Sequence, residues 1–180
     1  MLLYLVEMRE HLHPEVQSAR YAVFVDADRR YTDCSDGVIE LLGYDRSELL
    51  SMKIDDLSFD TSRVPHLFEE YRRERLQNGE FLLRHKNGTP ILIRYDSWVF
   101  EDGCHAAAWN PAEEWEQLYL AALIETNSDK MKGKAKIAMS AIRNRQSTYG
   151  AGENPDVLQK LRDAGEAVRS LLSCPGTDPS

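Results

Sequence analysis

The sequence has few cysteines and no long hydrophobic run. Cys34, Cys104 and Cys174 are the only cysteines among 180 residues, and no two of them form a Cys-x-x-Cys pair. This pattern argues against a zinc ribbon or a disulfide framework and is typical of reduced thiols. The apolar run at the start, residues 2–6, is too short for a signal peptide or a membrane span. We therefore expect a cytoplasmic protein without a membrane partner.

Sequence patterns of enzymes are also missing. The chain has no glycine-rich nucleotide loop, and no motif places two carboxylates, or a nucleophile and a base, together. Asp26, Asp28 and Asp33 surround one predicted turn, where aspartate is expected for local hydrogen bonding. His85 and His105 could face each other across a sheet, but two histidines without further ligands do not make a metal site. We predict that the chain is not an enzyme and binds no metal.

Basic residues are scarce in the first two thirds of the chain. Residues 1–127 carry 13 Lys and Arg against 24 Asp and Glu, whereas residues 128–152 carry 6 against 1. An acidic body repels phosphate backbones, so we expect no nucleic-acid partner. The lysines at 130, 132, 134 and 136 are two residues apart, which spreads them around a helix. A solvated helix or an electrostatic partner for an acidic surface is the favoured interpretation.

The first third of the chain predicts a hairpin followed by short helices. Residues 21–25 form an apolar, strand-like run, and residues 31–34 return after a polar turn. This places Cys34 at a strand end, where it is expected to be a buried apolar residue. Gly43 is suited to end one short helix, and Asp45 with Glu48 resembles the capping box of the next.

The middle third predicts one helix and three strands. Residues 63–78 are expected to form an amphipathic helix that stops at Gly79. After Gly79 the spacing of the apolar residues changes from that of a helix to that of a strand. Asn87-Gly88 is a strong hairpin signal, and Asp102-Gly103 marks a second turn. Residues 80–110 therefore predict an antiparallel meander.

The last third predicts helices. Residues 111–126 read as an exit helix with acids in its first turn. Residues 130–146 form a basic segment whose apolar residues share one side, namely Ala135, Ala138, Met139 and Ile142. Residues 155–173 form a last helix with apolar residues at alternating spacings of four and three, namely Val157, Leu161, Ala164, Val168 and Leu171.

The stretch YAVFVDADRRYTDCSDGVIELLGYDRSELL resembles the opening half of a PAS domain, in which a strand pair with an aspartate turn precedes a helix ending in Leu-Leu-Gly-Tyr. The hairpin RHKNGTPILIRYDSWVFEDG resembles the PAS turn and its long following strand. The resemblance implies an α+β fold, a PAS-like five-stranded antiparallel sheet of order 2-1-5-4-3 with helices on one face. Ser35 stands where the family often has Asn, and serine can still cap a helix.

We divide the chain accordingly. Residues 1–15 form an N-terminal arm or cap, 16–110 the PAS domain, 111–173 a helical extension and 174–180 a flexible tail. The extension is similar to helical tails that follow PAS domains in some bacterial signalling proteins.

In PAS domains, the longer helix packs over a cavity that holds haem, flavin, a small organic acid or nothing. The resemblance implies that haem could be held by His66, since some haem PAS domains use a histidine from the equivalent helix. A surface histidine without a ligand is the favoured interpretation. Flavin is not expected, because the chain has no GxNCRFLQ-like run. The candidate pocket residues are His66, Phe68, Tyr71, Ile93, Tyr95 and Trp109.

We therefore expect a non-enzymatic sensory or regulatory module. It would relay the binding of a small molecule or a partner through its exit helices to a homodimer or a separate signalling protein. The alternative is a ligand-free scaffold that acts as an adaptor. The candidate interface residues are Trp115, Leu118, Tyr119, Leu161, Val168 and Leu171.

Overall fold

The computed structural model describes residues 16, 18–62, 64–74, 76–100 and 102–173. The chain forms two compact units, a sheet unit over residues 1–111 and a helical unit over residues 112–180. The division lies one residue from the predicted domain boundary. The predicted arm, 1–15, and tail, 174–180, lie outside the described residues.

The sheet unit is built on a five-stranded antiparallel sheet of order β2-β1-β5-β4-β3. This is the predicted order, and it confirms the fold class. Gly88 and Gly103 have φ of 87° and 83°, the conformation that their predicted turns require of glycine. The strands are β1 (Ala22–Val25), β2 (Tyr31–Cys34), β3 (Leu76–Arg84), β4 (Pro90–Val99) and β5 (His105–Pro111).

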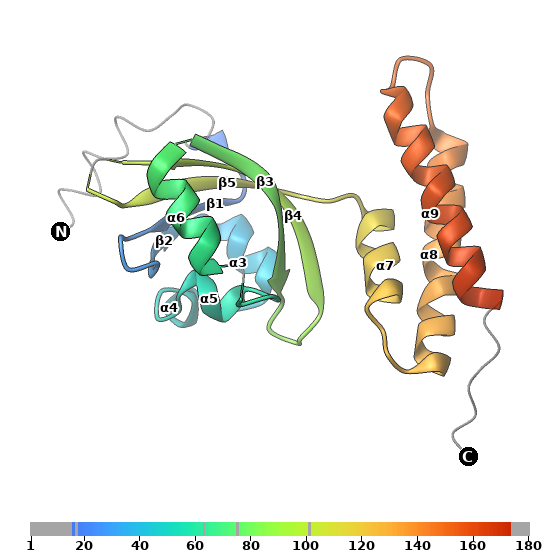
Figure 1. Ribbon diagram of the computed structural model, residues 1–180, viewed down its shortest axis with the longest axis horizontal. Helices are drawn as coiled ribbons and strands as arrows, with labels where there is room; N and C mark the ends of the chain where they lie inside the picture. Colours follow the sequence, from blue (N-terminus) through green and yellow to red (C-terminus); the bar gives the residue numbers. More distant parts are fainter. Residues whose placement is uncertain (1–15, 17, 63, 75, 101, 174–180) are drawn as a thin grey trace. The chain divides into compact units, whose positions relative to one another are not determined.

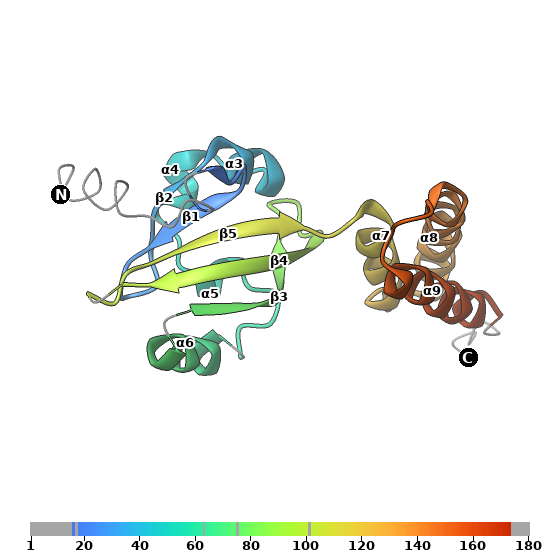
Figure 2. The same ribbon diagram turned by 90° about the horizontal axis from the view of Figure 1, so that it is seen from above.

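Short helices between β2 and β3 cover one face of the sheet (Figures 1 and 2). Gly43 ends α3 with φ of 73°, as predicted, and the N–H of Asp45 donates to the Glu48 carboxylate over 2.8 Å at the start of α4. Two short helices can therefore turn instead of continuing as one rod. These helices are α3 (Asp36–Leu42), α4 (Arg46–Leu49), α5 (Ile54–Leu57) and α6 (Val64–Glu74).

Ser35 precedes α3 but its side chain does not cap that helix. Its hydroxyl donates to the carbonyl of Arg20 over 2.6 Å and accepts from the N–H of Ala22 over 2.9 Å. The predicted capping role is therefore wrong. The hydroxyl instead joins the start of α3 to the chain entering β1.

The predicted helix over residues 63–78 is too long. The structure has α6 from Val64 to Glu74, and β3 already begins at Leu76. Gly79 lies inside β3, opposite Tyr95, instead of ending the helix. A Cβ at Gly79 would lie 3.0 Å from the Tyr95 hydroxyl, so the glycine leaves room for that ring. Pairing with the long strand β4 outweighs the local helical pattern.

The main core of the sheet unit lies between the sheet and its helices. Leu42, Leu49 and Leu57, one from each of α3, α4 and α5, are completely buried there, and Cys34 is 3% exposed as predicted. A second, smaller cluster lies apart from this core and includes Val16, Ala22 and Ala106.

The helical unit consists of α7 (Glu114–Leu123), α8 (Ser128–Thr148) and α9 (Pro155–Ser173). The predicted face of α8 is confirmed, because Ala135, Ala138, Met139 and Ile142 are its buried residues. The acids Glu114 and Glu116 lie in the first turn of α7, as predicted.

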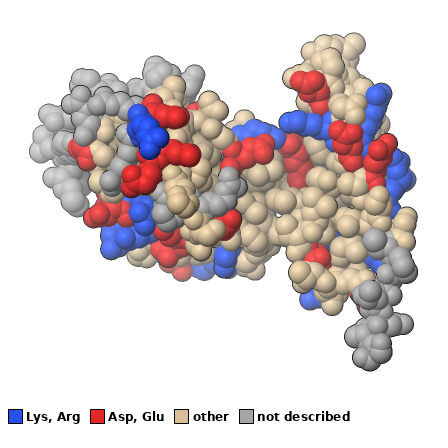
Figure 3. Space-filling view, viewed as in Figure 1, with Lys and Arg blue, Asp and Glu red and all other residues tan. Residues whose placement is uncertain are grey.

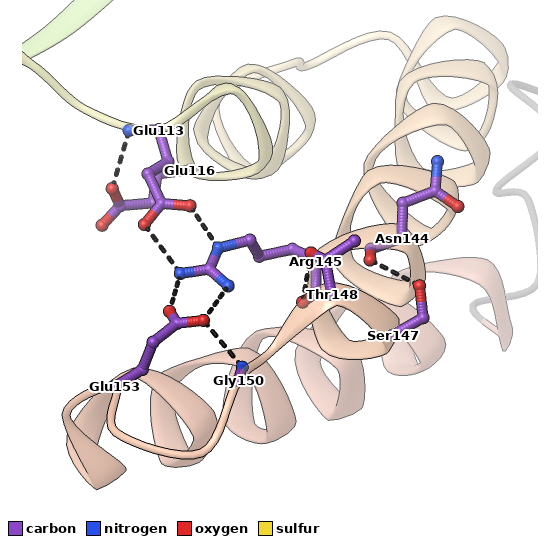
Figure 4. Close-up of polar contacts among 8 residues, drawn as sticks. All are labelled: Glu113, Glu116, Asn144, Arg145, Ser147, Thr148, Gly150 and Glu153. Atoms are coloured by element: carbon purple, nitrogen blue, oxygen red, sulfur yellow. Dashed lines mark hydrogen bonds and ion pairs between the residues drawn. The ribbon is translucent and has the colours of Figure 1, made fainter.

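Arg145 ties the ends of the three helices together (Figure 4). Its guanidinium donates to the Glu113 carboxylate over 2.6 Å and to the Glu153 carboxylate. Glu153 in turn accepts from the N–H of Gly150 over 2.8 Å. One planar guanidinium therefore joins the start of α7, the last turns of α8 and the loop before α9.

Candidate functional site

A cavity lies in the sheet unit between the inner face of the sheet and the helices α5 and α6. Its volume is about 50 Å³, enough for roughly three to five water molecules. The described residues that line it are mostly apolar: Val23, Val25, Tyr31, Ile54, Val64, Leu67, Phe68, Phe81, Leu83, Ile93, Tyr95, Ser97, His105, Ala107 and Trp109.

Four predicted pocket residues, Phe68, Ile93, Tyr95 and Trp109, line this cavity. His66 does not, because its side chain is exposed on α6. Placing His66 in the pocket was therefore wrong. The side chain of Tyr71 lies outside the described residues.

Ser97 and His105 belong to the cavity and were missed. On β4, Ser97 follows Ile93 and Tyr95 at a spacing of two, and on β5 His105 precedes Trp109 by four. Side chains on a strand alternate between faces, so both residues share a face with predicted pocket residues. That alternation was the signal that could have found them.

Ser97 is a buried polar residue in an apolar wall. It is 2% exposed, and its hydroxyl has no hydrogen-bond partner among the described residues. Its cross-strand neighbours are Ala107 on β5 and Gln77 on β3. A buried hydroxyl without a partner is energetically costly, so this position favours a bound group that can hydrogen-bond.

His105 is 5% exposed and packs edge-on against Phe68 of α6, with 5.3 Å between ring centroids. Burial lowers the pKa of His105 to about 4, and the nearby charge of Asp26 only partly opposes this. The imidazole is therefore uncharged at neutral pH. His85 lies at the other end of the sheet, since Arg84 pairs with Pro90 whereas Val99 pairs with His105. The two histidines, which the sequence allowed to face each other, therefore do not.

The lowered pKa of His105 should make the PAS-like sheet unit less stable in mild acid. The unfolded chain binds the proton near the ordinary histidine pKa of about 6.5 and the folded chain only near 4. The unfolded state therefore gains protons first, and stability falls as the pH drops from 6.5 to 4, by roughly 3 kcal/mol in all. Urea unfolding across this pH range measures it. His105→Gln should flatten this step, and an equally steep fall in that variant would contradict the assignment.

No charged side chain lines the cavity among the described residues. Tyr31 is also uncharged, because burial raises the pKa of its phenol far above neutrality. A charged ligand would lose its hydration without a partner here. The cavity therefore suits a small uncharged molecule.

Haem held by His66 does not fit this arrangement, because the His66 side chain is exposed and lies outside the cavity. Among the described residues, no group of three or more His, Cys, Asp or Glu side chains could hold a metal ion.

The predicted interface residues lie in two places in the helical unit. Trp115 and Leu118 line a groove beside α8, and Tyr119 packs against the core of the unit. Leu161 and Val168 are completely buried in that core, with Leu171 partly buried beside them. In this conformation, α9 directs its apolar stripe inward to its own chain, and contact with a partner through it stays a prediction.

On the face shown in Figure 3, basic side chains lie among acidic ones and form no continuous basic patch within the described part of the chain. None of the described helices is long and apolar enough to cross a membrane.

The sequence model of the PAS domain family matches residues 20–106. A search of curated proteins finds no match. Among solved structures, the chain is 18% identical to a PAS domain from a two-component sensor histidine kinase, with 61% of this chain and 97% of that chain covered and a TM-score of 0.48.

Two further structures are similar. The PAS domain of an HTR-like protein from Haloarcula marismortui is 19% identical, with 61% of this chain and 96% of that chain covered and a TM-score of 0.47. The LOV domain of the blue-light photoreceptor Aureochrome1 in its light state is 16% identical, with 56% and 88% covered and a TM-score of 0.48.

Three observations therefore agree on the fold of the sheet unit: the strand order, the helices between β2 and β3, and the family match. Residues 20–106 therefore form a PAS domain, which is followed by a C-terminal helical unit.

Proposed function

We propose that the PAS domain is a non-enzymatic sensor whose cavity binds a small uncharged molecule with one hydrogen-bonding group. The buried Ser97 hydroxyl, which has no partner among the described residues, carries this proposal. The apolar walls and the uncharged His105 support it, because they favour a neutral ligand.

The signal would leave the cavity along β5. Trp109 lines the cavity, β5 ends two residues later at Pro111, and α7 begins at Glu114. A ligand that changes the packing of Phe68 on α6 against this strand would alter the chain segment that enters α7. The ligand can shift the equilibrium between two packings of α6 against β5 only by binding one of them more tightly than the other. The output is a homodimer or a separate signalling protein in the cytoplasm.

The test uses short primary alcohols, from ethanol to 1-butanol, as probes. They carry one hydroxyl and approach the cavity in size, so binding on the order of millimolar is expected. Saturable shifts of backbone amide NMR signals should be largest at Ser97 and Ala107, which face each other in the wall. Acetate is the charged control and should shift nothing. Equal shifts with acetate would contradict the ligand class, and no shift with any alcohol would favour the ligand-free scaffold.

Ser97→Ala should have opposite effects on stability and on binding. Without ligand, removal of the partnerless hydroxyl should raise the free energy of unfolding by about 1 kcal/mol. With ligand, affinity for the alcohols should fall about tenfold, because their hydroxyl loses its partner. Urea unfolding and NMR titration measure the two effects.

Ser58→Ala is the matched control. Ser58 is also 2% exposed, but its hydroxyl donates to the carbonyl of Asp60 over 2.8 Å. Its loss should destabilise the domain by about 1 kcal/mol and leave alcohol binding unchanged. If Ser97→Ala were destabilising to the same extent, the Ser97 hydroxyl would have a partner in the free protein, and the proposal would lose its support.

A further inference from the structure

A groove runs along the helical unit between α7 and α8. Its volume is about 410 Å³, much larger than the cavity of the PAS domain. Trp115 and Leu118 of α7 form one side, and a stripe along α8 that includes Ile137, Ala141 and Asn144 forms the other. These α8 residues are four and three positions apart, so they share one helical face.

The groove contains two features that a partner would satisfy. Ile137 is 57% exposed, among the most exposed large apolar side chains that the structure describes. Trp115 is only 6% exposed, yet its indole N–H has no acceptor among the described residues. An occupant should therefore supply apolar surface for Ile137 and, once the buried indole turns toward the groove, an oxygen atom for the Trp115 N–H.

The groove itself carries the groups that such an occupant needs. Ile137 can fill an apolar space, and Asn144 carries a carboxamide oxygen. Figure 4 shows the Asn144 side chain pointing away from the Arg145 network. A second copy of the same surface could therefore place its own Asn144 near Trp115 and its own Ile137 in the groove. Such self-complementarity is what a two-fold interface requires.

Charge also favours a second copy in one orientation. Glu113 pairs with Arg145, so the acidic start of α7, including the exposed Glu114, lies beside the last turns of α8. The first turns of α8 carry exposed Lys130. A two-fold rotation that runs the two α8 helices antiparallel brings Lys130 of one copy toward Glu114 of the other.

We propose that the groove between α7 and α8 is a homodimer interface in which the α8 helices of two copies pack antiparallel. The interface is independent of the proposed ligand. If the alcohols do not bind, the proposed dimer interface is not affected. If the protein does not dimerise, the proposed ligand binding is not affected.

Ile137→Glu in the full chain tests the interface. The side chain is exposed, so the variant should fold, but its dissociation constant for the dimer should rise roughly thirtyfold or more. Sedimentation velocity over a concentration series measures this. Leu123→Glu is the matched control, since Leu123 is 45% exposed and does not line the groove, and it should dimerise as the wild type does.

The charge pair tests the orientation. Lys130→Glu and Glu114→Lys should each weaken the dimer about fivefold, and the double variant should recover most of this loss. In the wild type, the indole N–H signal that Trp115→Phe removes should shift as the protein concentration rises. A wild type that is monomeric at every concentration, or an Ile137→Glu variant that dimerises normally, would overturn the proposal. The proposal would also be overturned if the purified protein held another bound molecule in the groove.

Discussion

Replacing Gly37 with alanine should lower the free energy of unfolding of the PAS domain by about 4 kcal/mol. Gly37 is buried in α3, and a Cβ there would lie 2.3 Å from the carbonyl oxygen of Arg20. Because the obstacle is backbone, no side-chain rotation can relieve the contact. The helix would have to move away from the chain entering β1, which would also break the hydrogen bond from Ser35 to the same carbonyl. Urea unfolding followed by tryptophan fluorescence measures the loss.

Gly165→Ala is the matched control for Gly37→Ala. Gly165 is also a buried glycine in a helix, but a Cβ there would lie 3.8 Å from Ile142, an ordinary contact. This substitution should be neutral or stabilise the helical unit by about 1 kcal/mol through helix propensity. If the two substitutions had similar effects, the close approach of α3 to residue 20 would not be the reason for glycine at position 37.

The architecture of the sheet could be predicted because its signals are local and occur in a fixed order. Asn87-Gly88 and Asp102-Gly103 define two hairpins, and Gly43 with φ of 73° separates two helices. The resemblance to PAS domains then supplied the strand order, which no local pattern contains. In the helical unit, the spacing of Ala135, Ala138, Met139 and Ile142 was sufficient to identify the buried face of α8.

The end of α6 could not be predicted in the same way. The predicted helix continues through residues 76–78 and stops at Gly79, but in the folded chain Leu76 pairs with Trp98 and Gly79 with Tyr95. The partner strand is some twenty residues distant in the sequence, and its pairing decides the local structure. Helical propensity is only a weak preference, and tertiary contacts often override it.

The pocket was predicted in part, and the errors have a geometric cause. Val64, Leu67 and Phe68 line the cavity, and His66, about 200° around the helix from Val64, therefore faces away. Conversely, Trp109 was a candidate, and strand alternation places His105 on the same face of β5. That the Ser97 hydroxyl is buried without a partner follows only from the packed structure.

Leu161→Asp should unfold the helical unit. Leu161 is completely buried among α7, α8 and α9, so the substitution places an unpaired carboxylate in an apolar core and removes a large side chain. The expected cost is about 5 kcal/mol or more, comparable to the whole stability of a small unit. Circular dichroism should lose helical signal, whereas amide NMR signals of Ser97 and Ala107 in the PAS domain should keep their positions.

Lys160→Asp is the matched control for Leu161→Asp, because the neighbouring Lys160 is exposed on the same helix. It should keep the helical signal and change stability by less than about 1 kcal/mol. The pair also separates two roles of α9. If Leu161 contacts another molecule instead of its own unit, Leu161→Asp will leave the monomer folded and change only its association. If Leu161 supports the α7–α8 hairpin, as its burial indicates, the unit will unfold and the groove beside Trp115 will be lost with it.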